Sequence, residues 1–418
     1  MIITFMVLVA AAVMLVWEPV PSAVIALSIP VVLAMTGVLT VNEALSGFSN
    51  PVVVLFSSTF VIGAALFRTG LAHDIASFLK RLGGQRNLVL LGLLMFTAAA
   101  LSAALSNTGT VAVLLPMVTA LTAASRLERR PALMALAFSA SLGGTLTLIG
   151  TPPNLIVQAA LIERGLEPFA FFDFARIGLP IVAVSFIFLL TIGRKLLPKE
   201  HIPESWMETK REPMLRNVPV YKKVIAGSVM LVVLTMMAGG WFPLSIIALA
   251  GAITVVITGC ISPRRALASL EWETVFLFAG MLSLSVALEH TGAGELIATS
   301  AIRLLGTSPH PTLVVAVLFG LTWLLTQFMS NTASAALLVP IGLSIAEGIG
   351  ASEHAVLMAI AMAASCALAT PIGTPPNLLV YRCGGFKFAD YARVGLPLSL
   401  LLWALCSFAL PWLWPLAG

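Results

Sequence analysis

The letters GTPPNL occupy residues 150–155, and the same six letters return at residues 373–378. A second motif, SNT, precedes each copy, at residues 106–108 and 330–332. Each proline pair interrupts a long apolar run, because proline removes a helix hydrogen bond and clashes with the preceding turn. Two motifs that recur in the same order predict a tandem duplication.

Further landmarks extend this repeat over nearly the whole chain, at offsets between 217 and 224 residues. The recurring pairs are Thr36-Gly37 with Thr258-Gly259, Ala44-Leu45 with Ala266-Leu267, Thr69-Gly70 with Thr291-Gly292, and Asp173, Arg176, Gly178 and Pro180 with Asp390, Arg393, Gly395 and Pro397. So many landmarks in one order indicate that each half of the chain is one copy of the same unit.

The composition places both copies in a membrane. Of the 418 residues, 59% are hydrophobic and only 10% are charged, and the mean hydropathy is +1.03. Charged residues make up about a quarter of a soluble globular domain. Apolar runs long enough to cross a hydrocarbon core of about 30 Å recur from end to end. We therefore expect the lipid bilayer as a partner and no nucleic acid, with the net charge of +5 in loops at an anionic membrane surface.

Each half contains the same series of apolar segments. They lie near residues 2–17, 22–39, 51–67, 87–105, 110–124, 131–162 and 177–195, and again near 223–239, 243–260, 272–288, 311–328, 333–347, 354–380 and 394–415. As a helix, Thr110–Ala124 would be about 22 Å long, too short to cross comfortably. Only Ser, Asn, Thr and Gly at residues 106–109 separate the first pair of SNT-flanking segments, which predicts a re-entrant hairpin with SNT at its tip.

The distribution of Lys and Arg supports these hairpins. With five spans and one hairpin in each half, one membrane face receives 20 of these residues and the other receives 3. With six spans in each half the split is 13 against 10. Because Lys and Arg are enriched in cytoplasmic loops, the hairpin topology is favoured. It inverts the second half, places both termini outside, and makes the Arg126–Arg130 and Arg194–Lys223 clusters topology determinants only.

We therefore predict an all-α polytopic membrane protein with two inverted repeats, each with five transmembrane helices, one re-entrant hairpin and a helix broken near the midplane. Secondary transporters with such repeats bind ions and substrate at the repeat interface. Non-helical backbone survives at that depth only where protein buries it or a cavity adjoins it. The carbonyls of Gly150 and Gly373 can therefore coordinate a hard cation. Further neutral oxygens come from Ser106, Asn107, Ser330 and Asn331.

The helix N-termini after these motifs suit an anion, because they offer free N–H groups and a positive dipole end. The hydroxyls that can orient its oxygens are those of Thr108, Thr151, Thr332 and Thr374. No Lys, Arg, Asp, Glu or His falls in the middle of a predicted span. A dianion held without a basic residue needs nearby cations, which predicts sodium coupling, whereas a sodium/proton antiporter would hold a buried titratable carboxylate.

On the paired SNT and TPPN motifs, essentially the whole chain resembles the divalent anion:sodium symporter family of the ion transporter superfamily. The resemblance implies a homodimer, a fixed scaffold and a transport domain that moves as an elevator. The implied sodium sites are Ser102, Ser106, Asn107 and Gly150, and Thr326, Met329 (through its backbone), Asn331 and Gly373. The implied substrate contacts are Asn107, Thr108, Thr151, Ser330, Asn331, Thr332, Thr374 and Pro375.

The domain boundaries follow from the repeat and this resemblance. Scaffold elements are expected at residues 1–85 and 223–310, transport elements at 86–197 and 311–418, and a cytoplasmic linker at 198–222. Hairpin tips are expected at 106–108 and 330–332, and helix breaks at 150–154 and 373–377.

These features predict a secondary active transporter of the inner (plasma) membrane that carries a C4-dicarboxylate with sodium. Within transport, the alternative is sulfate or another inorganic anion, which needs the same donors in a smaller pocket. From another class, a passive anion channel or a membrane sensor stays open. An enzyme is not expected, because the sequence shows no nucleophile–base pair, metal cluster or cofactor motif.

Overall fold

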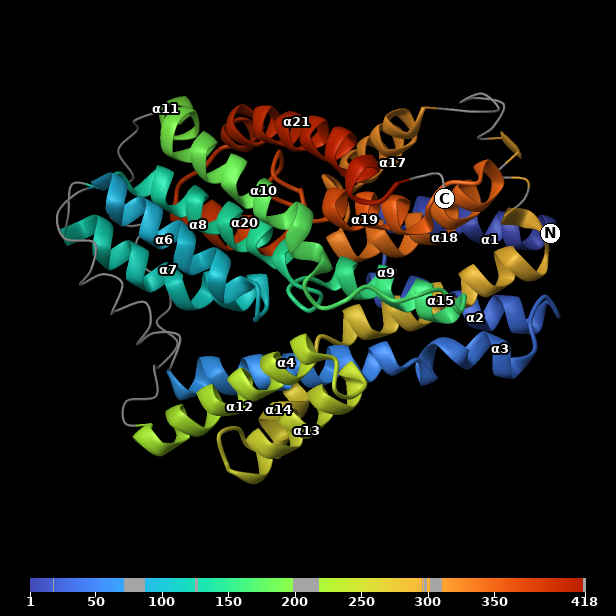
Figure 1. Cartoon of the computed structure of the whole chain (residues 1–418), viewed down its shortest axis with the longest axis horizontal. Helices are drawn as coiled ribbons and strands as arrows, with labels where there is room; N and C mark the ends of the chain where they lie inside the picture. Colours follow the sequence, from blue (N-terminus) through green and yellow to red (C-terminus); the bar gives the residue numbers. More distant parts are fainter. Residues whose placement is uncertain are drawn as a thin grey trace.

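The computed structural model shows a chain built of helices (Figure 1). The structure describes residues 1–17, 19–70, 87–124, 127–197, 218–294, 296, 299–300 and 310–415. Every regular element in these ranges is helical, and none of them is a strand. The predicted all-α class is confirmed. Most of the predicted linker, residues 198–217, lies outside the described residues.

The helices of the first half differ in length. The last of them is interrupted by a π-helical stretch. They are α1 (Ile2–Trp17), α2 (Ser22–Met35), α3 (Val41–Leu45), η1 (Ser46–Ser49), α4 (Pro51–Thr69), α6 (Asn87–Ser102), α7 (Asn107–Ala124), α8 (Arg129–Gly143), η2 (Gly144–Leu146), α9 (Pro152–Glu163), α10 (Asp173–Phe188), η3 (Leu189–Gly193) and α11 (Arg194–Leu196).

The second half repeats the main elements of the first in the same order. They are α12 (Val220–Gly239), α13 (Leu244–Ile257), α14 (Pro263–Ala268), α15 (Trp272–His290), α17 (Pro311–Thr326), α18 (Asn331–Ile349), α19 (Glu353–Ala364), α20 (Pro375–Cys383) and α21 (Phe388–Leu413). Thus α12 is the counterpart of α1, α15 of α4, α18 of α7 and α21 of α10.

The two halves interlock by exchanging partners. α2 packs on α15, while α13, the counterpart of α2, packs on α4, the counterpart of α15. Gly280 permits a close approach, because a Cβ there would lie 2.1 Å from the Ala26 carbonyl oxygen of α2. Ser283 Oγ of α15 also donates to the Ala44 carbonyl at 2.6 Å. Each half therefore depends on the other for a packing partner.

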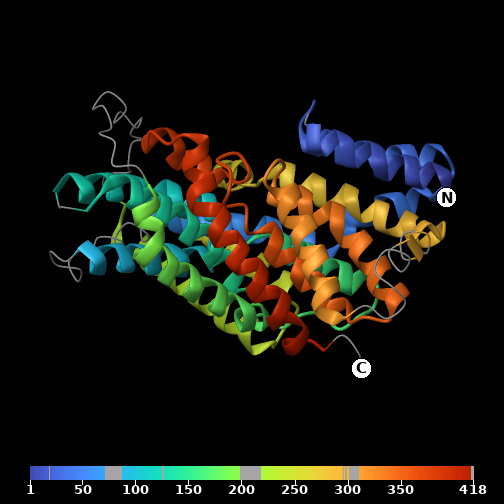
Figure 2. The same cartoon turned by 90° about the horizontal axis from the view of Figure 1, so that it is seen from above.

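Counterpart helices run in opposite directions along the long axis. α4 runs toward one end of the molecule and α15 toward the other (Figure 1). The α6–α7 hairpin occupies one end of the long axis, and the α17–α18 hairpin lies in the other part, in both views (Figures 1 and 2). Inverted repeats with re-entrant hairpins require this arrangement. Their placement across a bilayer stays a prediction.

By length and composition, six helical stretches in the described residues can cross a membrane. They are Val41–Thr69, Asp173–Leu196, Val220–Gly239, Trp272–His290, Asn331–Ile349 and Phe388–Leu413. α18 is one of them, and α7 begins at Asn107 and has 18 residues. The helix expected to be too short to span, α7, is not among the six, whereas its counterpart α18 is. Four-residue connections, 103–106 and 327–330, join the helices of each hairpin, which are in contact.

The hairpin turns and the helix breaks both lie slightly N-terminal to their expected positions. The turns precede Asn107 and Asn331, which start helices instead of forming the tips. The breaks span residues 144–151 and 365–374 instead of 150–154 and 373–377. Proline is tolerated in the first helical turn, where its missing N–H has no partner, and it disfavours a helical residue before it. The proline pairs therefore restart the helices after the breaks.

The helices form two groups. One contains α1–α4 and α12–α15, at the lower and right side of Figure 1, and the other contains α6–α11 and α17–α21. The main contacts between the groups join α4 and α15 to α7, α9 and α18. The expected scaffold and transport elements stay a prediction, both in their boundaries and in their separate roles.

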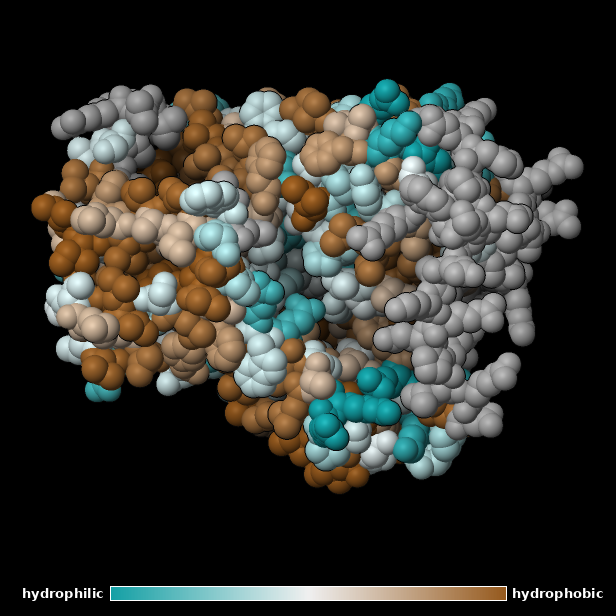
Figure 3. Space-filling model, turned by 180° about the vertical axis from the view of Figure 1, so that it is seen from behind, coloured by the Kyte–Doolittle hydropathy of each residue, from teal (hydrophilic) through white to brown (hydrophobic). Residues whose placement is uncertain are grey.

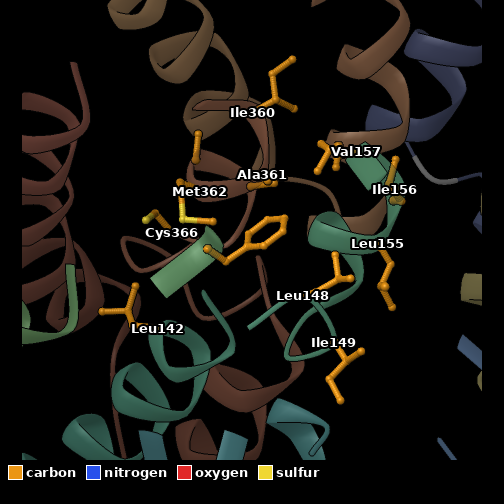
Figure 4. Close-up of a cluster of buried hydrophobic side chains, with 14 of the residues drawn as sticks. Leu142, Leu148, Ile149, Leu155, Ile156, Val157, Ile360, Ala361, Met362 and Cys366 are labelled. Atoms are coloured by element: carbon orange, nitrogen blue, oxygen red, sulfur yellow. The ribbon is translucent and has the colours of Figure 1, made fainter. Parts of the chain in front are cut away.

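The broken helices lie in the core of the second group. Leu155 and Ile156 of α9 and Ile360 and Met362 of α19 belong to one buried apolar cluster (Figure 4). These four side chains are at most 3% exposed. Since α9 comes from the first half and α19 from the second, this packing fixes one break relative to the other.

Apolar side chains also cover much of the outer surface. Phe408 and Trp412 of α21 are 73% and 81% exposed. Seen from behind, apolar residues dominate one side of the molecule, and more polar ones gather around a hollow in the middle (Figure 3). Such a surface suits helices that contact lipid.

Candidate functional site

The hairpin turns present the first residues of α7 and α18 to the broken helices. Ser330 caps α18, because its Oγ accepts a hydrogen bond from the Ala333 N–H at 3.2 Å. Ser106 occupies the equivalent place before α7, and its Oγ accepts from the Gly109 N–H at 3.4 Å. Both serine hydroxyls therefore serve first as helix caps.

Asn107 is surrounded by oxygens from three segments of the first half. One terminal atom of its amide lies 2.5 Å from Ser102 Oγ, 3.2 Å from the Gly150 carbonyl oxygen and 3.3 Å from the Ala140 carbonyl oxygen. This position suits an amide nitrogen that donates to the three oxygens. If the amide turns its oxygen inward instead, Ser102 Oγ can donate to it at 2.5 Å, but the two carbonyl oxygens repel it unless a cation lies among them.

Asn331 has the same surroundings in the second half. One terminal atom of its amide lies 3.0 Å from Thr326 Oγ1, 3.1 Å from the Gly373 carbonyl oxygen and 3.0 Å from the Ala364 carbonyl oxygen. Thr326 Oγ1 also donates to the Ala364 carbonyl at 3.0 Å. The two halves thus contain matching sets of neutral oxygens, each with a hydroxyl, an asparagine amide and two carbonyls.

Glycine is required where the first of these sets forms. A Cβ on Gly144 would lie 2.7 Å from Asn107 Oδ1 and 2.9 Å from the Gly150 carbonyl oxygen. A Cβ on Gly150 would lie 2.4 Å from the Gly144 carbonyl oxygen. All three distances are too short for a carbon atom. A larger residue at either place would displace the loop that carries the Gly150 carbonyl.

Two asparagines hold the broken backbone in place. Asn154 Nδ2 donates to the carbonyls of Gly144 at 3.1 Å and Thr147 at 2.8 Å. Asn377 Nδ2 donates to the carbonyls of Ala367 and Thr370, both at 2.9 Å. Non-helical carbonyls in an apolar interior need such donors. Both asparagines are fully buried.

The structure brings together six of the eight predicted sodium ligands, in two sets of three. Ser102, Asn107 and Gly150 meet in the first half, and Thr326, Asn331 and Gly373 meet in the second. The predicted ligands Ser106 and Met329 lie in the hairpin turns and are not, among the described residues, within hydrogen-bond distance of the asparagine amides.

The predicted substrate threonines and Pro375 lie at helix N-termini. Thr151 precedes α9, is 2% exposed, and its Oγ1 has no hydrogen-bond partner in the described part of the chain. Thr374 precedes α20 and Thr332 is in the first turn of α18, and both are buried. Thr108 is half-buried in the first turn of α7, and Pro375 is exposed at the start of α20.

One buried ion pair was not expected from the sequence. Asp390 lies outside the predicted spans and Arg130 belongs to a cluster expected to act on topology only, but Arg130 Nη2 lies 2.5 Å from Asp390 Oδ2 with both side chains at most 5% exposed. Arg130 also donates to the Gly385 carbonyl at 3.2 Å, and its guanidinium lies over the Phe386 ring. The expectation that Arg130 acts on topology only is therefore wrong, because it ties α8 to α21.

Sequence reasoning also missed Ala140, Ala364, Asn154 and Asn377. The two alanines contribute only backbone carbonyls, so their side chains carry no signal of a ligand. The two asparagines did carry one, because each belongs to a copy of the repeated GTPPNL motif. A polar residue repeated beside two prolines in an apolar run indicates a partner for broken backbone.

Comparison with known families gives an independent result. The profile of the family described as "citrate transporter" matches residues 12–355 and 300–417. The chain belongs to this family. The resemblance drawn from the SNT and TPPN motifs is thereby confirmed, since the citrate transporter family is part of the ion transporter superfamily.

Individual relatives agree with this result. An uncharacterized transporter of Haemophilus influenzae is 32% identical over 395 residues, which cover 90% of this chain and 84% of that protein. The sodium-dependent dicarboxylate transporter SdcS of Staphylococcus aureus is 24% identical, covering 92% of this chain and 80% of its own. The crystal structure of the YdaH transporter of Alcanivorax borkumensis has the same fold, with a TM-score of 0.66 at 15% identity over 90% of this chain and 86% of YdaH.

The protein is therefore a multi-pass membrane transporter of the citrate transporter family. Its family and its relatives are transporters and not enzymes. The expectation that the chain is not an enzyme is confirmed by these relatives.

Proposed function

We propose that the protein carries a small dianion, a C4-dicarboxylate, together with sodium. The observation that supports this most is the pair of matching oxygen sets around Asn107 and Asn331. Carbonyls of unwound helices coordinate sodium in transporters built from repeats. The description of the family and the printed name of SdcS point to carboxylate substrates in related proteins.

Electrostatics explains why sodium and the dianion would bind together. None of the side chains that form the two oxygen sets is charged, and the described residues contain no group of three or more His, Cys, Asp or Glu that could hold a metal ion. Each helix N-terminus contributes only about 0.3–2 kcal/mol to anion binding. Two bound sodium ions would supply the missing positive charge beside the hydroxyls of Thr108, Thr151, Thr332 and Thr374.

The two groups of helices support an elevator mechanism. Both oxygen sets lie within the group of α6–α11 and α17–α21, so this group could move with its ligands against α1–α4 and α12–α15. The proposal includes a homodimer in the inner membrane, with both termini outside and the linker in the cytoplasm. The charge distribution of the sequence supports this orientation.

Uptake into proteoliposomes tests the proposal. Labelled succinate, citrate and sulfate are offered with and without an inward sodium gradient. We expect succinate to accumulate above its equilibrium level only with the gradient, and a proton gradient alone to have no effect. Equal uptake under both conditions would replace the symporter with a uniporter or channel, and accumulation of sulfate alone would replace the dicarboxylate.

Variants connect the activity to the site. Asn107→Ala and Asn331→Ala each remove an amide from one oxygen set, so we expect uptake to fall at least about tenfold. Asn42→Ala is the matched control, because Asn42 is exposed on α3. Normal uptake by both site variants would refute the assigned site.

A further inference from the structure

Two threonines join the helix breaks to the hairpin turns. Thr147 Oγ1 donates to the Ala103 carbonyl, in the turn between α6 and α7. Thr370 Oγ1 donates at 2.7 Å to the Gln327 carbonyl, in the turn between α17 and α18. The two threonines are 223 residues apart, as are Asn154 and Asn377.

The asparagines described above act on the same threonines. Asn154 donates to the backbone carbonyl of Thr147, and Asn377 donates to that of Thr370, at 2.8 and 2.9 Å. Each half therefore contains one relay, which runs from the restarted helix through an asparagine and a threonine to the hairpin turn. Three of these four residues are at most 5% exposed, and Thr147 is 7% exposed.

The relays join the segments that supply the candidate sodium ligands. In the first half, Asn107 follows the hairpin turn and Gly150 belongs to the break. The Thr147–Ala103 hydrogen bond ties these two segments together. A shift of the break against the hairpin would separate the Gly150 carbonyl from the Asn107 amide, which are 3.2 Å apart.

We propose that Thr147 with Asn154, and Thr370 with Asn377, are positioning residues that set the sodium affinity of their own half. They act by holding the hairpin in register with the broken helix, and they touch neither the ion nor the substrate. The inference rests on the proposed sodium-coupled function. It adds that each half has its own relay, so that a substitution in one relay changes the sodium affinity of one site only.

The first test removes one hydroxyl. Thr147→Val keeps the shape of the side chain but loses the donor to Ala103, whereas Thr147→Ser keeps the donor. Thr97→Val is the matched control, because Thr97 is also buried but donates only to the Leu93 carbonyl of its own helix. The sodium concentration for half-maximal succinate uptake is measured in proteoliposomes, together with the maximal rate at saturating sodium.

We expect Thr147→Val to raise the half-maximal sodium concentration about two- to tenfold, the effect of one lost hydrogen bond. The maximal rate should stay within twofold of the wild-type rate, and Thr147→Ser and Thr97→Val should behave like the wild type. An unchanged sodium requirement in Thr147→Val, or an equal change in Thr147→Ser, would overturn the relay. If Thr147→Val does not fold, Thr370→Val is held to the same expectations.

A double-mutant cycle tests the separation of the halves. Thr147→Val and Asn154→Ala belong to one relay, so their combined effect should be smaller than the product of the single fold-changes. Thr147→Val and Asn377→Ala belong to different relays, and their fold-changes should multiply. The reverse pattern would overturn the assignment of one relay to each half. Sodium-independent uptake by the wild type would instead overturn the proposed function. A failure of the relay and a failure of the proposed function therefore give different results.

Discussion

Removing one partner of the buried pair of Arg130 and Asp390 should destabilise the protein far more than removing one partner of the exposed pair of Arg164 and Glu347. In Asp390→Asn the carboxylate is lost, and the buried guanidinium of Arg130 loses this counter-ion. Removing one partner from a buried pair costs about 3–5 kcal/mol, because the remaining charge has lost its hydration and its partner. Asp390 also accepts a hydrogen bond from the Lys387 N–H at 2.8 Å, which an amide oxygen at the same place can keep.

Arg164 provides the comparison within the same molecule. Its Nη1 lies 3.0 Å from Glu347 Oε2, but the glutamate side chain is 69% exposed. Pairs with such exposure contribute about 0–1 kcal/mol. Glu347→Gln should therefore lower stability much less than Asp390→Asn, although each substitution removes one negative charge from an arginine.

The assay is thermal unfolding of the purified protein in detergent, followed by helical circular dichroism. We expect the midpoint of Asp390→Asn to fall clearly below that of Glu347→Gln, which should unfold close to the wild type. The double variant Arg130→Met with Asp390→Leu removes both charges and should recover most of the loss. Equal midpoints for the two single variants would refute the reasoning, as would a double variant less stable than Asp390→Asn.

Three further predictions concern the site and the topology. Gly144→Ala should abolish sodium-dependent uptake, because the new Cβ would lie 2.7 Å from Asn107 Oδ1, whereas Gly92→Ala meets no atom within 4 Å and should transport normally. Thr332→Val should weaken succinate binding about tenfold, since an unpaired anion oxygen costs about 1–3 kcal/mol, while sodium binding alone, measured by titration, stays unchanged. A single cysteine at Arg129 should be labelled only from the cytoplasmic side, and labelling from outside would reject the topology.

The sequence predicts the repeat well because duplication leaves its evidence in residue identities. Every main helix of the second half follows the order of the first, and the SNT and GTPPNL motifs mark the hairpins and breaks to within several residues. The errors at these places have a local cause. Proline starts helices as well as ending them, and Asn107 and Asn331 begin helices next to the turns.

The sequence predicts less of what depends on tertiary packing. The repeated motifs and the family resemblance predicted that Asn107 and Gly150 share a site, but not that the Ala140 carbonyl joins them, because a backbone carbonyl has no residue-specific signature. Nor does the position of a charged residue in the sequence show whether its side chain is buried at the start of a helix. Arg130 and Asp390 lie 260 residues apart, and only the fold brings them together.

The exchange of α2 and α4 with α15 and α13 has a consequence for synthesis. When the ribosome has completed only the first half, the main packing partners of α2 and α4, which are α15 and α13, do not yet exist. The surfaces of α2 and α4 that pack on these helices stay in contact with lipid or with an insertion factor until the second half has been synthesised. The slow step of assembly therefore depends on contacts distant in sequence.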